Sequence, residues 1–149
     1  VSEVEGSFKI FDAKITSSSD DFTDAVVEMT ADASSINTDN DMRDKDLKGS
    51  GYFDVAQYPN LTFKSKTFKK VNDNNYKVTG DLTIHGITKT IELDVLCRMG
   101  INPMSKKPVA GFKITGKLNR KDFDIASGAP EAILSNEVSL VANVEFSKE

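Results

Sequence analysis

Two alternating segments that meet at a short turn constrain the fold of this chain more than any other feature. Apolar and polar residues alternate along 80–84 and again along 88–95, on either side of a three-residue turn at His85-Gly86-Ile87. A period of two indicates a strand with one buried face, and a glycine-containing turn between two such segments is typical of a β-hairpin. The apolar phase of this predicted hairpin consists of Leu82, Ile84, Ile91, Leu93 and Val95.

The same alternation recurs along most of the chain. In each segment the apolar residues occupy one phase, so one face of every strand is expected to point toward a shared interior. The predicted strands are 6–15, 24–32, 60–70, 74–84, 88–99, 109–119 and 136–147. Half-buried strands without long helical segments predict an all-β, mostly antiparallel domain.

Length and charge narrow the class of protein further. The 149 residues are expected to form a single domain over 1–149, long enough for a proper core without disulfides or metals. With 23 acidic and 19 basic side chains, the net charge of -4 gives no general attraction to nucleic acid or to an anionic lipid surface. The basic residues Lys64, Lys66, Lys69 and Lys70 are interpreted as an exposed strand face, and nucleic acid is excluded as a partner.

The sequence predicts no integral membrane segment. None of its apolar runs approaches the roughly 20 residues that a helix needs to span a bilayer. The opening residues VSEVEGSFKIF do not have the pattern of a signal peptide, and a processed chain would lack that pattern as well.

Residue types that could support catalysis or bind a metal are scarce. The single histidine, His85, lies in the hairpin turn, and the single cysteine, Cys97, continues the apolar phase of its strand. Four aspartates in one loop suggest a calcium site. A calcium loop that begins at Asn37 would, however, place Met42 where glycine is needed and Lys48 where glutamate is needed. The sequence therefore predicts no catalytic residue and no metal site.

Short helices and turns are expected near one end of the strands. Residues 41–48 begin with a capping aspartate, Asp41, and are followed by Gly49, which predicts one or two helical turns. Further turns are expected at 54–58 and at 119–123. These segments are expected to form a cap over one end of a barrel or sandwich.

Three segments in order carry a resemblance to a known family. They read SSINTDNDMRDKDLKGSGYFDVAQYPNLTFKS (34–65), GDLTIHGITKTIELDV (80–95) and LNRKDFD (118–124). In this order, and over essentially the whole chain, they resemble the YceI-like family, whose members are known as polyisoprenoid-binding or lipid-binding proteins. The most specific motifs are Ser35-Ile36-Asn37-Thr38 followed by Arg43-Asp44 and Leu47, Phe53-Asp54 with Tyr58-Pro59 and Phe63, the hairpin that begins at Gly80, and Asn119-Arg120 with Asp122-Phe123. Asp124 departs from the family, which usually has glycine at this position.

The resemblance implies an antiparallel, lipocalin-like β-barrel of eight strands, whose lumen holds one long isoprenoid or similar amphiphilic chain. The periodicity of the sequence alone does not separate a barrel from a sandwich. Family members that resemble this chain open with a strand that contains a tryptophan and a His-Ser pair, and this chain has no tryptophan. We therefore expect the opening strand to be lacking, which leaves an open seam or one filled by a second copy in a homodimer.

The function that the resemblance implies is burial of a lipid without chemistry. Large apolar residues in the interior phase are predicted to line the lumen, and three further residues are predicted to form a mouth or lid. The lining candidates are Phe8, Ile10, Met29, Phe63, Val78, Leu82, Leu93, Val95, Phe112, Ile114, Leu140 and Val144. The mouth candidates are Leu47, Phe53 and Tyr58. No cofactor is expected, and the partner is a polyisoprenoid, quinone or fatty-acid-like lipid that is stored or transported.

Two other functions stay open at this point. The domain could be a β-rich interaction or stress-response module without a bound lipid, or an enzyme that acts on an isoprenoid or quinone held in the lumen. A continuous apolar tube favours the lipid binder, and a fully packed interior favours the interaction module. The resemblance also implies a bacterial protein located in the periplasm or secreted, with a cytoplasmic location as the alternative.

Overall fold

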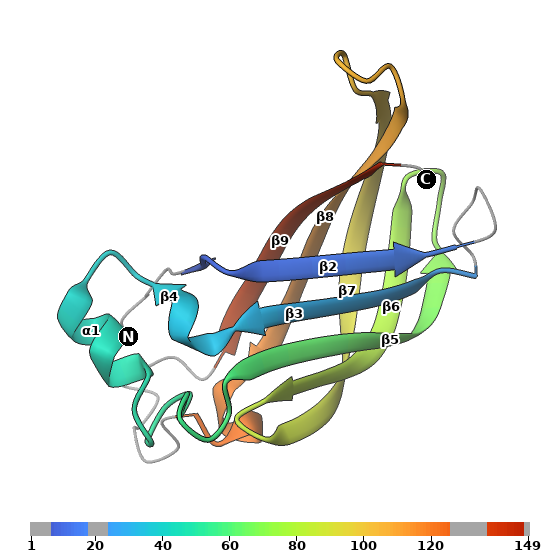
Figure 1. The fold of residues 1–149 in the computed structure, drawn as a ribbon. Helices are drawn as coiled ribbons and strands as arrows, with labels where there is room; N and C mark the ends of the chain where they lie inside the picture. Colours follow the sequence, from blue (N-terminus) through green and yellow to red (C-terminus); the bar gives the residue numbers. More distant parts are fainter. Residues whose placement is uncertain (1–6, 18–23, 126–136, 148–149) are drawn as a thin grey trace.

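Strands make up most of the described chain. The computed structural model describes residues 7–17, 24–125 and 137–147 (Figure 1). Its strands are β1 (Ser7–Phe8), β2 (Phe11–Thr16), β3 (Val26–Asp32), β4 (Ile36–Asn37), β5 (Asn60–Lys70), β6 (Asn75–Ile84), β7 (Ile87–Ile101), β8 (Pro108–Asn119) and β9 (Glu137–Ser147). Within the described residues the helices are η1 (Ala33–Ser35), α1 (Asp41–Leu47) and η2 (Arg120–Phe123), of which η1 and η2 are short 3-10 helices.

Seven strands form one antiparallel sheet that curls into a nearly closed barrel (Figure 1). The strand order is β2-β3-β5-β6-β7-β8-β9, and every neighbouring pair is antiparallel. This confirms the predicted all-β antiparallel barrel. In the described sheet β2 and β9 are the edge strands and are not hydrogen-bonded neighbours, and we call the gap between them the seam. The lack of an opening strand and a homodimer that fills the seam stay predictions.

The first predicted strand is broken in two. β1 pairs with β4 in a separate ribbon, whereas β2 pairs with β3 in the barrel. At the break the N–H of Lys9 donates to the carbonyl of Ser35 (3.0 Å). After the break the odd residues Ala13 and Ile15 face the interior, so Ile10 is out of phase and 63% exposed. The predicted place of Ile10 in the lining is therefore wrong, because the alternation does not run through the break.

The β6–β7 hairpin has a tighter turn than the sequence analysis expects. Ile84 pairs with Ile87, so the turn holds two residues, His85 and Gly86, and not three. Both have a positive φ, 56° and 72°, which is the backbone of a type I′ turn whose twist matches that of the flanking strands. The predicted interior phase of this hairpin is confirmed by the buried side chains of Leu82, Ile84, Leu93 and Val95.

One irregularity bends the wall of the barrel. The register of β5 against β6 shifts between Ser65 and Thr67, which is the pattern of a β-bulge. Opposite the bulge lies Gly80, where an added Cβ would come within 2.5 Å of the carbonyl oxygen of Lys64. Two backbones approach closely here, and only glycine leaves room for them. Beyond the bulge, the interior phase of β5 changes from odd to even residues.

The predicted helix in the second quarter of the chain is α1. The residue before it, Asn40, has extended backbone angles, and its side-chain oxygen accepts a hydrogen bond from the N–H of Arg43 (3.0 Å). The helix is therefore capped by Asn40 and not by the predicted Asp41, which is already helical. The prediction is one residue out because asparagine and aspartate cap helices equally well, so composition alone does not choose between neighbours.

The two ends of the barrel differ. α1, η2 and the β6–β7 turn lie at one end, which we call the capped end, and the β7–β8 hairpin projects from the other, which we call the hairpin end (Figure 1). The predicted turn at 54–58 is confirmed by the hydrogen bond from the N–H of Tyr58 to the carbonyl of Asp54 (2.8 Å), and the predicted turn at 119–123 contains η2. η2 ends at Asp124, whose φ of 54° is a left-handed conformation that favours the glycine usual in the family.

Candidate functional site

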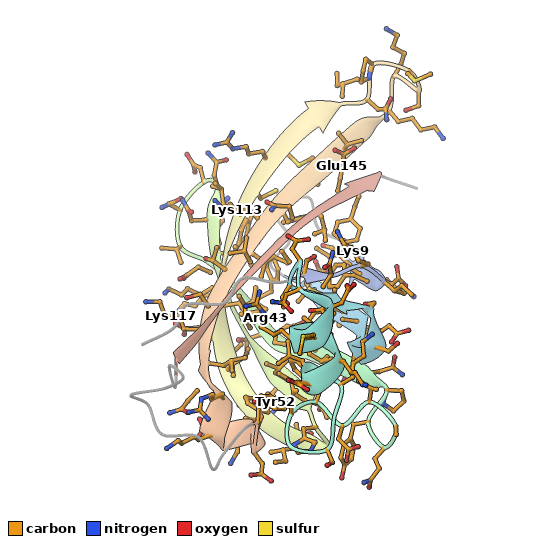
Figure 2. All side chains as sticks on the ribbon, turned by 90° about the vertical axis from the view of Figure 1, so that its left-hand side faces the viewer. Lys9, Arg43, Tyr52, Lys113, Lys117 and Glu145 are labelled. Carbon is orange, nitrogen blue, oxygen red and sulfur yellow. The ribbon has the colours of Figure 1, made fainter. Side chains whose placement is uncertain are left out.

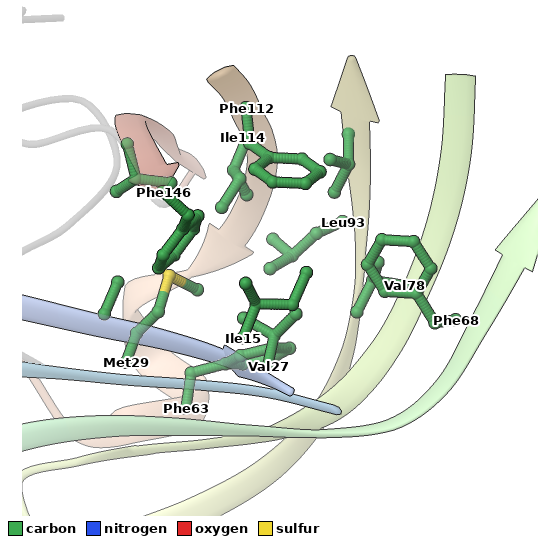
Figure 3. A pocket seen from close by; sticks show the side chains of 13 residues that line it. Ile15, Val27, Met29, Phe63, Phe68, Val78, Leu93, Phe112, Ile114 and Phe146 are labelled. Carbon is green, nitrogen blue, oxygen red and sulfur yellow. The ribbon is translucent and has the colours of Figure 1, made fainter. Parts of the chain in front are cut away.

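The interior of the barrel contains a pocket lined entirely by apolar side chains (Figure 3). Its 13 lining residues come from all the strands of the barrel sheet. They are Ala13, Ile15, Val27, Met29, Phe63, Phe68, Val78, Leu93, Val95, Phe112, Ile114, Val144 and Phe146. Such a lining can hold a hydrocarbon by excluding water, and it offers no group for acid–base or nucleophilic chemistry.

The pleat and the register of the strands bring these side chains together. Successive side chains of a strand point to opposite faces, so a strand supplies every second residue to the interior. Val78 lies opposite Leu93 in the β6–β7 ladder. Phe112 lies opposite Val144 in the β8–β9 ladder. The pocket is therefore a direct product of the alternation that the sequence shows.

The pocket is much narrower than the tube that a long ligand needs. Its free volume is about 10 Å³, roughly the room that one water molecule requires. Aromatic rings fill the space around it: Phe112 and Phe146 meet edge to face with centroids 5.7 Å apart. Phe68 and Tyr76 lie with centroids 4.8 Å apart. A long chain can enter this interior only when the barrel widens or these rings turn aside.

Along the barrel, the pocket lies toward the hairpin end. Phe68 is near the end of β5 and Phe112 is in the first half of β8, and both of these strand segments lie at the hairpin end. The buried residues Leu82, Leu118 and Phe123 at the capped end do not line the pocket. The free space therefore lies away from the cap.

The structure gathers about half of the predicted site residues around this pocket. Those that line it are Met29, Phe63, Val78, Leu93, Val95, Phe112, Ile114 and Val144. Those that do not are Phe8, Ile10, Leu47, Phe53, Tyr58, Leu82 and Leu140. Leu82 is buried and Leu140 is partly buried in the same core, outside the pocket. That the gathered residues contact a ligand stays a prediction.

Five of the lining residues are not among those predicted from the sequence; they are Ala13, Ile15, Val27, Phe68 and Phe146. Ile15, Val27 and Phe146 follow the alternation of their strands, so that signal was available in the sequence. Phe68 is different, because the bulge between Ser65 and Thr67 shifts it out of phase with Phe63. Ala13 is too small to stand out as a lining residue.

The residues predicted to form a mouth lie at the capped end and take part in its closure. They are Leu47, Phe53 and Tyr58. The ring of Phe53 meets that of Phe8 edge to face, with centroids 5.7 Å apart. The ring of Tyr58 meets the imidazole of His85 in the same way at 5.1 Å, and His85 Nδ1 lies 3.2 Å from the carbonyl oxygen of Phe123. These contacts tie the chain before β5 to the hairpin turn and to η2.

A polar network holds α1 at the capped end. One carboxylate oxygen of Asp44 accepts hydrogen bonds from the N–H and the hydroxyl of Thr38 (2.9 and 2.6 Å). The guanidinium of Arg43 donates to the hydroxyl and to the carbonyl of Thr38 (2.9 and 2.8 Å). The hydrogen bond from the Thr38 hydroxyl is the main reason why the pKa of Asp44 lies below its ordinary value. These motif residues therefore stabilise the cap and do not face the pocket.

Reactive groups are few in the described structure. Among the residues it covers, no group of three or more His, Cys, Asp and Glu side chains is placed to hold a metal ion. Cys97 is buried, and burial raises the pKa of its thiol, which disfavours the reactive thiolate.

Among the residues that the structure describes, no helix has the length and apolar character needed to cross a membrane.

The fold and the interior define the class of protein, which is a small antiparallel, lipocalin-like barrel with a hydrophobic pocket. Comparison with known proteins specifies the class further. The chain belongs to the YceI-like family, because the family model for the YceI-like domain matches residues 1–146. A UPF0312 protein of Staphylococcus aureus is 38% identical to it over 99% of this chain and 86% of the relative.

Solved structures share the same fold. The YceI protein of Campylobacter jejuni superimposes with a TM-score of 0.91 at 32% identity, over 100% of this chain and 87% of that one. A polyisoprenoid binding domain from Saccharophagus degradans has a TM-score of 0.57 at 17% identity, over 95% of this chain and 82% of that one, a likeness that shows the fold alone. The predicted family and barrel are thus confirmed.

Proposed function

We propose that this protein binds a long-chain isoprenoid or a similar amphiphilic lipid inside its barrel, and stores or transports it without changing it chemically. The observation that supports this most strongly is the pocket lining, to which every strand of the barrel contributes apolar side chains and no strand contributes a polar one. A pocket of this composition favours a ligand whose buried part is a hydrocarbon chain.

Desolvation supplies the affinity in this proposal. Removing a methylene group from water is worth about 0.8 kcal/mol, but ordering the chain and the protein opposes it, and about 0.3 kcal/mol per heavy atom is realised for larger ligands. An isoprenoid of about 20 heavy atoms would then bind with about 6 kcal/mol, which corresponds to a Kd on the order of tens of micromolar. Longer chains bind more tightly only as far as the interior can extend around them.

The ligand-filled barrel must be wider than the empty one, and the seam allows this. β2 contributes Ala13 and Ile15 to the pocket, and β9 contributes Val144 and Phe146. Because β2 and β9 are not hydrogen-bonded to each other in the described sheet, moving them apart breaks no ladder between them. The lost contacts are those between apolar side chains, and the hydrocarbon of the ligand replaces them.

Membership of the YceI-like family supports a binding role rather than a catalytic one. The structural neighbour from Saccharophagus degradans is itself described as a polyisoprenoid binding domain, which makes an isoprenoid the first ligand class to test here. A quinone or a fatty-acid-like lipid presents similar hydrocarbon and is the next class to test. A periplasmic or secreted location stays a prediction.

The direct test is uptake of an isoprenoid alcohol dispersed in dilute detergent. We expect native mass spectrometry of the purified protein to detect a bound apolar chain, and delipidated protein to take up geranylgeraniol at a ratio of one to one. Binding is followed by native mass spectrometry and by calorimetry. If the protein carries no chain and takes up neither geranylgeraniol nor a quinone nor a fatty acid, the lipid-binding proposal is refuted and the interaction module is favoured.

A pair of variants on one strand tests whether the pocket is the binding site. Ala13 lines the pocket from the edge strand β2, and its neighbour Lys14 is exposed on the other face. Ala13→Phe fills the free space and is expected to lower the affinity for geranylgeraniol at least about tenfold, since it removes room for several methylene groups. Lys14→Phe adds the same ring outside the barrel and is expected to change nothing. Equal uptake by both variants, with both folded by circular dichroism, would place the ligand elsewhere.

A further inference from the structure

The β7–β8 hairpin extends past the rim of the barrel (Figures 1 and 2). The ladder between β6 and β7 ends at the pair of Asn75 and Leu96, and the ladder between β8 and β9 ends at the pair of Val109 and Ser147. From Arg98 onward, β7 therefore pairs with β8 alone among the described strands. Residues 101–108 form a two-stranded tip that stands clear of the wall, and 98–100 at its base pair with β8 but no longer with β6.

This tip carries apolar side chains that are almost fully exposed. Met99 is 65% exposed, Ile101 is 69% exposed and Met104 is 92% exposed. We call these three residues the apolar tip. Large exposed apolar groups gathered on one projecting element mark a site of interaction rather than a part of the core.

The apolar tip continues the lining of the barrel. Met99 and Ile101 are in the same phase of β7 as Leu93, Val95 and Cys97, which are all buried in the interior. The sulfur atoms of Cys97 and Met99 lie 4.0 Å apart. An unbroken apolar strip thus runs along β7 from the pocket to the solvent. Because the pocket lies toward this end of the barrel, the strip connects the free space to the tip.

Hydrogen bonds fix the shape of the tip. The side-chain oxygen of Asn102 accepts hydrogen bonds from the N–H groups of Met104 and Ser105 (2.9 and 3.1 Å). The backbone of Asn102 also bonds at both ends of the turn, donating to Lys107 and accepting from Lys106 (2.9 and 2.8 Å). The backbone of the turn therefore has a defined conformation, and it presents the exposed side chain of Met104.

The charge around the apolar tip is positive, although the chain as a whole carries -4. Residues 98–108 contain Arg98, Lys106 and Lys107 and no acidic residue. The neighbouring end of β5 adds the exposed Lys69 and Lys70. The acidic groups on the adjoining elements are Asp73 in the β5–β6 turn and Glu145 on β9. Apolar side chains surrounded by lysine and arginine suit the boundary between the headgroups and the acyl chains of an anionic bilayer.

We infer that the β7–β8 hairpin is a membrane-docking element: its apolar tip inserts between anionic lipid headgroups, and the apolar strip of β7 guides a lipid chain between the bilayer and the pocket. The docking part is independent of the ligand, whereas the guiding part rests on the proposed function. The alternative is that the apolar tip binds a protein partner or a second copy of this chain, and vesicle binding distinguishes this alternative from membrane docking.

Sedimentation with vesicles tests the docking. We expect the protein to bind vesicles of phosphatidylcholine and phosphatidylglycerol and to bind vesicles of phosphatidylcholine alone much more weakly. The variant with Arg98→Gln, Lys106→Gln and Lys107→Gln should bind the anionic vesicles on the order of 100-fold less, since each charge near such a surface contributes about fivefold. The matched control carries Lys45→Gln, Lys89→Gln and Lys121→Gln at the capped end. This control has the same net charge as the tip variant, and its binding to the anionic vesicles should stay close to that of the original chain.

A second pair of variants tests the apolar contribution. Met104→Ser should weaken binding to the anionic vesicles by about tenfold, since it removes the most exposed apolar side chain from the tip. Met42→Ser removes a methionine that is 80% exposed on α1 at the capped end, and it should have no effect. The eight side chains exchanged in these four variants are all exposed, so the variants are expected to fold.

Transfer measurements separate this inference from the proposed function. The tip variants should take up detergent-dispersed geranylgeraniol normally but should acquire it slowly from anionic vesicles. Normal vesicle binding by the tip variants, or no vesicle binding by the original chain, overturns the docking. A dimer that the tip variants dissociate, in the absence of vesicle binding, also overturns it and identifies a second copy as the occupant. Vesicle binding without any uptake of lipid supports the docking and refutes the proposed function.

Discussion

The two ends of the barrel differ in how completely their apolar side chains are buried. At the capped end, Phe123 is 1% exposed, and the network of Thr38, Arg43 and Asp44 satisfies the polar groups around α1. At the hairpin end, the pocket lies close to the rim, and Met104 is 92% exposed. The difference teaches that the two ends are built differently: one end closes the fold, and the other leaves apolar surface exposed.

The largest expected effect on stability comes from a cavity made at the capped end, and it tests the difference between the two ends. Phe123→Ala is expected to lower the free energy of unfolding by about 3–5 kcal/mol, because the ring is fully packed and its loss leaves a void. Met104→Ala at the hairpin end should change it by less than about 0.5 kcal/mol. Urea unfolding followed by circular dichroism measures both. Similar losses for the two variants would mean that the hairpin tip is also part of the stabilising core.

A glycine pair sharpens the comparison between the wall and the projecting hairpin. An added Cβ at Gly80 would collide with the backbone of Lys64, so Gly80→Ala is expected to destabilise the protein by about 1–3 kcal/mol. At Gly100 in the hairpin, the nearest atom to an added Cβ is Val109 Cγ2 at 3.8 Å. Gly100→Ala should therefore stabilise the protein by about 0.4–1 kcal/mol through the unfolded chain. If both substitutions changed the free energy of unfolding in the same direction, the difference in packing between the two glycines would be contradicted.

Acid is expected to loosen the capped end before the hairpin end. The pKa of Asp44 is held below its ordinary value of 3.8, mainly by the hydroxyl of Thr38. A lowered pKa in the folded state means that the carboxylate stabilises the fold above pH 3.8, and that this stabilisation is lost as the pH falls through the lower value. Hydrogen exchange of the α1 amides should speed up in that range. Asp44→Asn should remove this pH response, and a response that survives the substitution would assign it to another group.

The smallest expected effect concerns the thiol near the hairpin end. Cys97 is buried, its pKa is raised by burial, and the sulfur of Met99 lies against it. Met99→Ala should uncover the thiol slightly and raise its rate of alkylation by iodoacetamide by about two- to threefold. Arg98→Ala changes the opposite face of β7 and should leave the rate unchanged. A rate that responds to Arg98 and not to Met99 would mean that the strand phase at the rim is wrong.

Much of the barrel is predictable because its strands are half-buried. The expected segments 60–70, 74–84 and 109–119 agree with β5, β6 and β8 to within a residue. Apolar and polar residues alternate for as long as one face of the strand is buried. The single strand expected at 6–15 is not observed, because alternation in composition does not reveal where the chain leaves one sheet for another. The break between β1 and β2 is fixed by backbone hydrogen bonds to a distant segment.

The site is less predictable than the fold for two physical reasons. Alternation tells which face of a strand is interior but not how far along the barrel a residue lies, so Leu82 and Phe112 are equivalent in the sequence, although only Phe112 lines the pocket. The bulge between Ser65 and Thr67 also inverts the phase of β5, which hides Phe68. Depth and phase both depend on the register between strands, and register is a property of pairs of segments.

The seam has a consequence for selectivity. In a fully closed barrel, the girth of the cavity is fixed by the number of strands and their stagger, so guests of the wrong cross-section are rejected. Here the described cylinder is interrupted between β2 and β9, and its circumference can adjust without the loss of a ladder there. A barrel with an adjustable circumference would accept thin and thick hydrocarbon chains alike. In the proposed lipid-binding role, chain length and headgroup, rather than the thickness of the tail, would then decide which lipids are retained.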